Sequence, residues 1–359
     1  MMAMKRETTA RRDASGVMQD ERRDEVTSLA RRMFGQDPRR VAFPGGKSRA
    51  AFIADMGDEA GSAPQPWVFA KRSDLDDAQM EAIVLKALQP SGHTPRLKGR
   101  FERWVVQEAL PGTRLPLVLD RLTNPAEREA LIVAALDALV AIHETADRVG
   151  LQHRVPKVGT VDGWLWNRTG AAKRIARTAG IDAPDIDRDW LVERMDVRRS
   201  HFVKWDARPG NALVHHSADG AQVSWFDWED CGRSTPLDDL AFVLFDEWTP
   251  LDEAATRRLM ARYTPRFAGR LKGEEADLYL RLFAMTHTVL RLRMALKLHA
   301  RKDEWWDRGY CLDGDKVGVT PVETANLIRR GLWLAREHAK LAPYAPWLEA
   351  VAQRYAIPL

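Results

Sequence analysis

The chain has 359 residues, of which 45% are hydrophobic and 30% charged, a balance typical of folded soluble proteins that excludes a largely disordered or collagen-like chain. Its 55 basic and 51 acidic residues nearly cancel and form no long basic block, which argues against a nucleic-acid-binding protein. The longest apolar stretch, residues 130–142, is too short to span a membrane, and the charged N-terminus lacks the apolar core of a secretory signal. We therefore expect a cytoplasmic protein with neither membrane nor nucleic-acid partners.

The first third of the chain is predicted to form a small antiparallel sheet with helices beside it. Residues 1–18 are polar and lack an apolar period, which predicts a mobile tail. Short segments rich in branched and aromatic residues predict strands at Val41–Phe43, Ala50–Ala54 and Trp67–Lys71 and a strand or strand pair over Phe101–Leu110. Apolar residues at helical spacing predict helices over residues 21–34 and 74–88.

The rest of the chain is predicted to be mainly helical. Asn124, Pro125 and Glu127 form a helix-start signal for a helix that runs to about residue 145. Further helices are expected near 185–200, 238–247, 252–263, 273–300 and 321–340. Between the first two of these, apolar runs at 212–214 and 223–226 predict a hairpin. The pattern indicates an α+β protein of two lobes, with residues 19–110 as a small β lobe and 111–359 as a larger, mainly helical lobe.

One segment of the helical lobe carries side chains that suit phosphate chemistry. Asp206 is expected in a loop, Asn211 at the start of the next strand, and Asp227 just after the strand that follows. A hairpin would bring Asn211 and Asp227 side by side, with Asp206 across the mouth. Such oxygen ligands suit Mg²⁺, and the remaining carboxylate can accept a proton from an attacking hydroxyl group. The segment therefore predicts phosphoryl transfer.

The order and spacing of these residues resemble the aminoglycoside phosphotransferase and small-molecule kinase family, whose catalytic loop has the pattern His-Gly-Asp-x-x-x-x-Asn. The resemblance implies a bilobal protein-kinase-like fold, with Asp206 as catalytic base and Asn211 and Asp227 as Mg²⁺ ligands. A downstream match, Pro236–Ala241, puts Asp239 on a residue that braces the site. The chain departs from the pattern at Lys204-Trp205, which replaces His-Gly. Lys204 could lower the pKa of the catalytic carboxyl, contact phosphate or point to solvent.

The same resemblance implies that the first lobe binds the ATP or GTP that donates the phosphate. Lys71 matches the lysine that holds the α- and β-phosphates, and Glu81 is the best candidate for its ion-pair partner, ahead of Asp76 and Asp77. A P-loop NTPase is disfavoured because Val41 stands where its first glycine is needed. The remaining nucleotide-binding candidates are a turn that suits a phosphate loop, Gly45, Gly46, Lys47 and Ser48, and a hinge, Gln107, Glu108 and Leu110.

The acceptor is less well defined by the sequence. Candidates to line its site, or to carry structural hydrogen bonds, are Arg208, Glu229, Asp230, Trp305 and Trp306. Tryptophans beside carboxylates, at 303–307 and again at Asp246-Glu247-Trp248, suit a cationic or sugar-like acceptor. Basic residues along 281–302 would favour an anionic or neutral acceptor if they face the cleft. His143 is expected to be a packed, hydrogen-bonded core residue.

The resemblance implies transfer of the γ-phosphoryl group of ATP or GTP to a hydroxyl group of a small molecule, an aminoglycoside-like or other hydroxylated antibiotic, which would make the protein a resistance enzyme. An alternative with the same chemistry is a metabolite kinase acting on choline, homoserine, a sugar or a nucleoside. A third hypothesis is a catalytically silent nucleotide-binding module. The choice between ATP and GTP, the phosphorylated hydroxyl and the oligomeric state stay open.

Overall fold

The computed structural model describes residues 21–43, 51–57, 65–217 and 220–359. The chain divides into two compact units, one formed by residues 1–89 and 95–110 and the other by residues 90–94 and 111–359. The predicted tail and the predicted phosphate loop with Gly45, Gly46, Lys47 and Ser48 lie outside the described residues. Among the described residues, no helix is long and apolar enough to cross a membrane.

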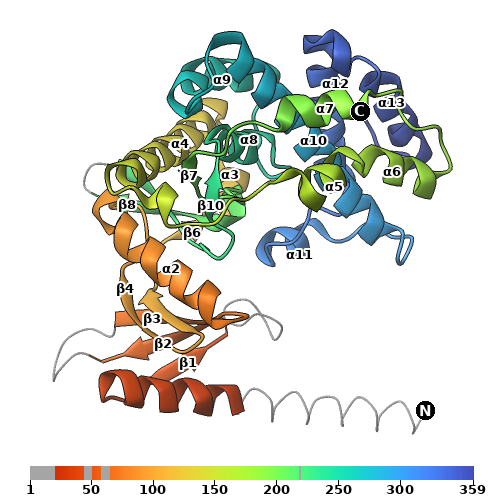
Figure 1. The fold of residues 1–359 in the computed structure, drawn as a ribbon. Helices are drawn as coiled ribbons and strands as arrows, with labels where there is room; N and C mark the ends of the chain where they lie inside the picture. Colours follow the sequence, from red (N-terminus) through yellow and green to blue (C-terminus); the bar gives the residue numbers. More distant parts are fainter. Residues whose placement is uncertain (1–20, 44–50, 58–64, 218–219) are drawn as a thin grey trace, which may run out of the picture. The chain divides into compact units, whose positions relative to one another are not determined.

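The first unit contains a five-stranded antiparallel sheet with strand order β1-β2-β3-β5-β4 (Figure 1). Its strands are β1 (Arg40–Ala42), β2 (Ala51–Met56), β3 (Gln65–Lys71), β4 (Leu97–Phe101) and β5 (Trp104–Glu108). The antiparallel sheet predicted from the alternating short apolar segments is confirmed, and the segment predicted over Phe101–Leu110 is the second strand of a β4–β5 hairpin.

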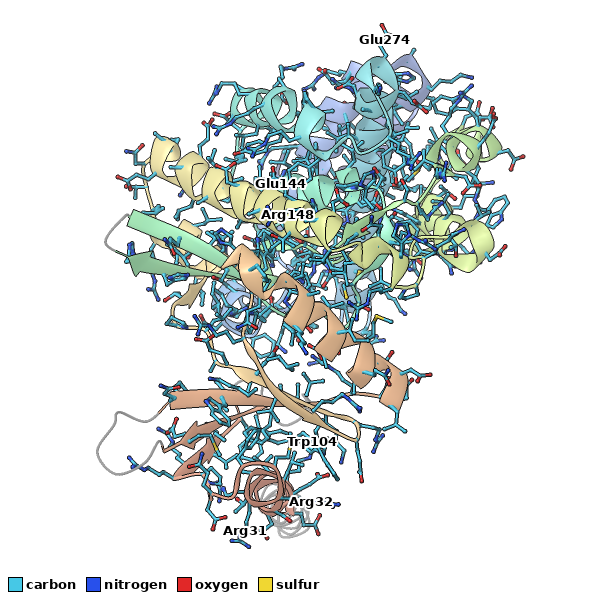
Figure 2. All side chains as sticks on the ribbon, turned by 60° about the vertical axis from the view of Figure 1, so that its left-hand side comes forward. Arg31, Arg32, Trp104, Glu144, Arg148 and Glu274 are labelled. Atoms are coloured by element: carbon cyan, nitrogen blue, oxygen red, sulfur yellow. The ribbon has the colours of Figure 1, made fainter. Side chains whose placement is uncertain are left out.

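Both faces of this sheet are covered. Phe69 and its neighbour Ala70 on β3 are both buried, although successive strand residues point to opposite faces. Phe69 and Trp104 pack against the helix of residues 21–34 in one apolar cluster, and Figure 2 labels Trp104 inside this unit. Helix α2 (Leu75–Leu88) packs against β4 and β5, and its N-cap Asp74 accepts a hydrogen bond from the Asp77 backbone.

The second unit is mainly helical, as predicted. The helix-start signal at Asn124 is confirmed, because its side chain accepts a hydrogen bond from the Ala126 nitrogen at 3.0 Å. The predicted helices correspond to α4 (Pro125–Arg148), α7 (Arg188–Met195), α8 (Leu237–Phe245), α9 (Glu253–Phe267), α10 (Gly273–His299) and α12 (Pro321–Glu337). Helices that the sequence pattern missed are α3 (Leu115–Arg121), α5 (Trp166–Thr169), α6 (Ala171–Ala179), α11 (Arg308–Asp313) and α13 (Tyr344–Arg354). Every residue of α8 is buried, and this helix contacts α4, α9 and α10.

Two small sheets position the segment with the candidate catalytic residues. The predicted hairpin is present as β8 (Ala212–Ser217) and β9 (Gly220–Trp225), with Ala212 opposite Trp225, and β6 (Thr113–Arg114) pairs with β8. Strand β7 (His201–Val203) pairs with β10 (Gly232–Ser234). The chain leaves β7 directly into the loop that begins at Lys204, so this loop starts from a buried strand.

Candidate active site

The loop after β7 is fixed to the buried helix α8 through one carboxylate. Asp239, in the first turn of α8, accepts hydrogen bonds from the backbone nitrogens of Lys204 at 2.7 Å and Trp205 at 2.9 Å. His143 on α4 lies with its Nε2 2.9 Å from the same carboxylate, and both side chains are buried. His143 is thus a hydrogen-bonded core residue, and Asp239 holds the start of the loop.

The loop itself has an uncommon backbone conformation. Trp205 and Asp206 have φ angles of +52° and +54°, the left-handed region that is unfavourable for residues with a Cβ atom. The indole of Trp205 packs 4.7 Å from the ring of Trp164 and 5.7 Å from that of Phe242. This packing, together with Asp239, offsets the strain that arises because tryptophan stands where the family pattern has glycine.

Asp206 is held by two neighbours on its own loop. Arg208 Nε donates to Asp206 Oδ1 at 2.8 Å, and Asn211 Nδ2 donates to Asp206 Oδ2 at 2.9 Å. Burial alone would raise the pKa of the Asp206 carboxyl, but the positive charges of Arg208 and Lys204 outweigh burial, and the pKa is lowered from its ordinary value. The carboxylate is therefore ionised at neutral pH.

Asn211 and Asp227 present oxygen atoms at adjacent positions across the hairpin. The Phe226 nitrogen donates to the Asn211 carbonyl at 3.1 Å, which places the residue before Asp227 directly against Asn211. Asn211 uses its amide nitrogen for Asp206, so its side-chain oxygen is the atom of this amide that can serve as a metal ligand. One carboxylate and one amide oxygen fit Mg²⁺, which completes its shell with water and phosphate oxygens.

Lys204 does not point to solvent. Its side chain is fully buried, and its Nζ donates to the backbone carbonyl of Asp227 at 2.7 Å. Of the three roles that the sequence left open for Lys204, exposure to solvent is excluded by its burial. Its positive charge contributes to the lowered pKa of Asp206, which agrees with another of these roles.

In the first unit, the expected pair of Lys71 with Glu81 is not formed, so that interpretation was wrong. Lys71 Nζ instead lies 2.5 Å from Glu25, and Arg72 makes a two-bond pair with Glu81, with distances of 2.5 and 2.6 Å. Side chains alternate between the faces of a strand, so Lys71 follows Phe69 to the face of the N-terminal helix, while Arg72 turns toward α2. The sequence pattern correctly predicted Glu81 on α2 as an ion-pair partner. The basic residue that pairs with it is Arg72, one position after the predicted Lys71.

The hinge candidates lie at the end of β5. Gln107 is buried in the sheet, and the Glu108 nitrogen donates to the Arg96 carbonyl at 2.8 Å. Leu110, which is half-buried, is the last residue of the first unit. The segment therefore joins the two compact units, the position in which a hinge is expected.

The acceptor candidates are distributed over different environments. Glu229 and Asp230 are exposed, Trp306 packs in an apolar cluster with Trp248, and the ring of Trp305 lies 4.1 Å from that of His299. The expected acceptor cluster at Asp246-Glu247-Trp248 is not available to a ligand, because both carboxylates are buried and Arg291 makes a two-bond pair with Glu247.

Asp315 is a neighbour of the loop of residues 204–211, and no sequence pattern predicted this contact. A Cβ atom on Gly210 would lie 2.2 Å from Asp315 Oδ1, so this carboxylate sits directly against the loop. Arg114 pairs with Asp315 at 3.1 Å and donates to the carbonyls of Leu312 and Asp313 at 2.7 Å. Gly210 and Asp315 are 105 residues apart in the sequence, and the local signal of their contact is the small residue at position 210.

The profile of the phosphotransferase enzyme family (APH) matches residues 42–275, more than half of the chain. The chain belongs to this family. The match includes all the catalytic-loop residues described above, and it confirms the resemblance seen in the sequence and the protein-kinase-like fold. No curated protein sequence matches the chain significantly.

Solved structures with low sequence identity share the fold of this family member. A protein from Ralstonia eutropha JMP134 assigned as an aminoglycoside phosphotransferase has a TM-score of 0.54 at 14% identity, covering 86% of this chain and 97% of its own. A choline/ethanolamine kinase family protein from Mesorhizobium loti has a TM-score of 0.50 at 14% identity, covering 92% and 99%. APH(2″)-IIa in complex with gentamicin has a TM-score of 0.50 at 12% identity, covering 88% and 97%.

Proposed function

We propose that the protein transfers the γ-phosphoryl group of ATP or GTP to a hydroxyl group of a small molecule. The observation that carries this proposal is the arrangement around Asp206: an ionised carboxylate in a loop fixed by Asp239, with the side-chain oxygen of Asn211 and the Asp227 turn beside it. Phosphoryl transfer depends mainly on positioning and charge, and a fixed loop with an ionised carboxylate supports both.

Each residue has a defined task in this proposal. Asp206 orients the acceptor hydroxyl and accepts its proton as the phosphoryl group is transferred. Asn211 and Asp227 hold Mg²⁺, which neutralises charge on the phosphates when it is bound. In the first unit, Lys71 and Arg72 are the candidate cations for the phosphates.

The silent-module hypothesis is disfavoured by the state of the loop. A module that only binds nucleotide has no need for an ionised carboxylate at position 206, yet the burial cost of that charge is met by Arg208 and Lys204. The hydrogen bond from the Phe226 nitrogen to the Asn211 carbonyl, which brings the segments of the two proposed metal ligands together, also supports a catalytic interpretation.

The acceptor can be proposed by class. An aminoglycoside-like antibiotic or a choline-like cation would need free carboxylates, but two carboxylates near the described loop are paired with arginines, Asp315 with Arg114 and Glu247 with Arg291. These pairs favour a second candidate class, a neutral or anionic hydroxyl compound such as a sugar or nucleoside. Aminoglycoside-like acceptors stay in the proposal because structures of related fold include a gentamicin complex.

A screen of acceptor pools tests the proposal. Purified protein is incubated with Mg²⁺, ATP or GTP, and pools of aminoglycosides, other hydroxylated antibiotics, sugars, nucleosides and amino alcohols, and products are identified by mass spectrometry. We expect one pool to gain the mass of a single phosphate group in a Mg²⁺-dependent manner. Tight nucleotide binding without any product across all pools would favour the silent-module hypothesis, and no nucleotide binding would overturn the proposal.

A further inference from the structure

Lys204 stands where the chain departs from the family pattern, and its surroundings limit what it can do. Its side chain has no exposed surface, although lysine side chains are almost always at least partly in water. A buried ammonium group needs a specific partner to offset the loss of hydration. The group that Lys204 contacts therefore indicates what the lysine does at this position.

That partner is the turn that carries Asp227. Nζ of Lys204 donates to the Asp227 carbonyl oxygen at 2.7 Å and lies 5.1 Å from the centre of the Trp228 ring. The backbone nitrogen of Lys204 donates in the opposite direction, to Asp239 Oδ2 at 2.7 Å. One residue thus connects helix α8, the start of the catalytic loop and the turn after β9.

The turn has a conformation that needs such support. Asp227 has a φ of +62°, in the left-handed region that is unfavourable for a residue with a Cβ atom. The residues on either side are held: the Phe226 nitrogen donates to Asn211 at 3.1 Å, and the Trp228 indole nitrogen donates to the Trp225 carbonyl at 3.2 Å. Lys204 supplies the hydrogen bond to Asp227 itself.

We propose that Lys204 is a positioning residue for Asp227: by holding the Asp227 carbonyl, its ammonium group fixes the direction in which the Asp227 carboxylate faces the metal–nucleotide complex. Lys204 acts through Asp227, because its side chain is fully buried and its ammonium group donates to the Asp227 carbonyl. The part of this inference that concerns metal binding rests on the proposed function. The part that concerns the turn rests only on the contacts of this chain.

Hydrogen exchange of the metal-free protein tests the contact directly. Lys204→Met keeps an unbranched side chain, shorter by one bond, and removes its donor. We expect backbone exchange in the peptide that contains residues 226–230 to become about 10-fold faster, since one hydrogen bond to a charged group is lost. Lys173→Met, which removes an exposed lysine on α6, is the matched control and is expected to leave this peptide unchanged.

Two further variants keep the exchange test decisive. Lys204→Gln is polar but about one bond shorter, so it is expected to show faster exchange even if Lys204→Met does not fold. Lys204→His restores a ring N–H donor and is expected to recover slow exchange in part. Exchange at the wild-type rate in a folded Lys204→Met or Lys204→Gln protein would overturn the proposal.

Metal affinity tests the consequence for Asp227. Binding of Mn²⁺ in the presence of a non-hydrolysable ATP analogue is measured by electron paramagnetic resonance. Residues that orient metal ligands typically contribute 10–100-fold to metal affinity, so we expect the Mn²⁺ dissociation constant of Lys204→Met to rise by about that factor, with metal-free nucleotide binding unchanged. Unchanged Mn²⁺ affinity would overturn the positioning role. A wild-type protein that binds no Mn²⁺ would overturn the proposed function, and hydrogen exchange alone would then decide whether Lys204 holds the turn.

Discussion

The catalytic loop of the second unit and the two adjacent cations of the first unit are held in different ways. Lys204 and Asp239 are fully buried, and each hydrogen bond they make joins different elements of the fold. Lys71 and its partner Glu25 keep 30% and 42% of their side chains exposed, whereas the Arg72–Glu81 pair is 11% and 1% exposed. Buried pairs hold one geometry, and exposed pairs can exchange partners with little loss of stability.

This difference indicates which residues are already in place before a nucleotide binds. The loop with Asp206 is set by contacts within the second unit, so it does not depend on a ligand for its shape. In the first unit, the buried Arg72–Glu81 pair is the fixed one, and Lys71 has the freedom to change partner. The predictions below test this division, from the largest expected effect to the smallest.

Replacement of Asp206 should have the largest effect on activity. Asp206→Asn keeps the size of the side chain but removes the proton acceptor, so we expect kcat to fall by about 10²–10⁴-fold. Nucleotide binding, measured by calorimetry, should be unchanged because the loop keeps its hydrogen bonds to Asp239. Asp182→Asn, at an exposed position, serves as control. A variant with full activity would show that Asp206 is not the base.

Replacing Arg72 and replacing Lys71 should have clearly different effects on the stability of the protein. Arg72→Gln leaves Glu81 buried without its ion-pair partner, so we expect the free energy of unfolding to fall by about 3 kcal/mol. Lys71→Gln breaks a partly exposed pair and should change the free energy of unfolding by less than about 1 kcal/mol. Urea denaturation of both variants measures the difference. Equal losses for the two variants would contradict the division between a fixed and an adaptable cation.

The buried network below the loop should make stability depend on pH. Burial, with the nearby Asp239 charge, raises the pKa of Asp238 to about 7, although Ser234 and Tyr279 hydrogen-bond to it. A raised carboxyl pKa means that the folded state keeps a proton that the unfolded chain has lost. The stabilisation that this bound proton contributes is complete below about pH 4 and is lost as the pH rises through about 7.

Asp238→Asn tests this pH dependence by comparison. The free energy of unfolding of the wild type minus that of Asp238→Asn should fall by about 2–3 kcal/mol between pH 5 and pH 7. Chemical denaturation at several pH values gives this difference, and a constant difference would show that Asp238 is ionised in the folded protein throughout.

A small effect is expected at Gly210. A Cβ atom there would press on Asp315, whose side chain is the end that can move, so Gly210→Ala should cost about 1 kcal/mol of stability. The added change Asp315→Ala should recover most of this cost, as measured in a double-mutant cycle. A double variant no more stable than Gly210→Ala alone would mean that some other contact makes position 210 crowded.

The sequence predicted the local arrangement around Asp206 more closely than the ion pairs of the first unit, for a physical reason. Asp206 and Asn211 lie just before the β8–β9 hairpin and Asp227 just after it, so the pairing of the two strands brings these segments together. The choice between Lys71 and Arg72 depends instead on which strand face each occupies, and that follows from the helix packed on each face.

Long-range contacts account for the other differences. Arg114 and Asp315 meet through the packing of α11 near the loop, and no periodicity along the chain signals that contact. The carboxylates of Asp246 and Glu247 looked available for an acceptor because their neighbours in sequence are polar or aromatic. Their burial against Arg291 on α10 is a property of helix packing that the local sequence does not contain.

A crystal structure of the protein with Mg²⁺ and a non-hydrolysable ATP analogue would test the central claim most directly. We predict a metal ion bound by Asn211 Oδ1 and the Asp227 carboxylate, with Asp206 unligated by metal and Lys204 still donating to the Asp227 carbonyl. A nucleotide bound with its metal away from Asn211 and Asp227 would contradict the assignment of this hairpin as the phosphoryl-transfer site.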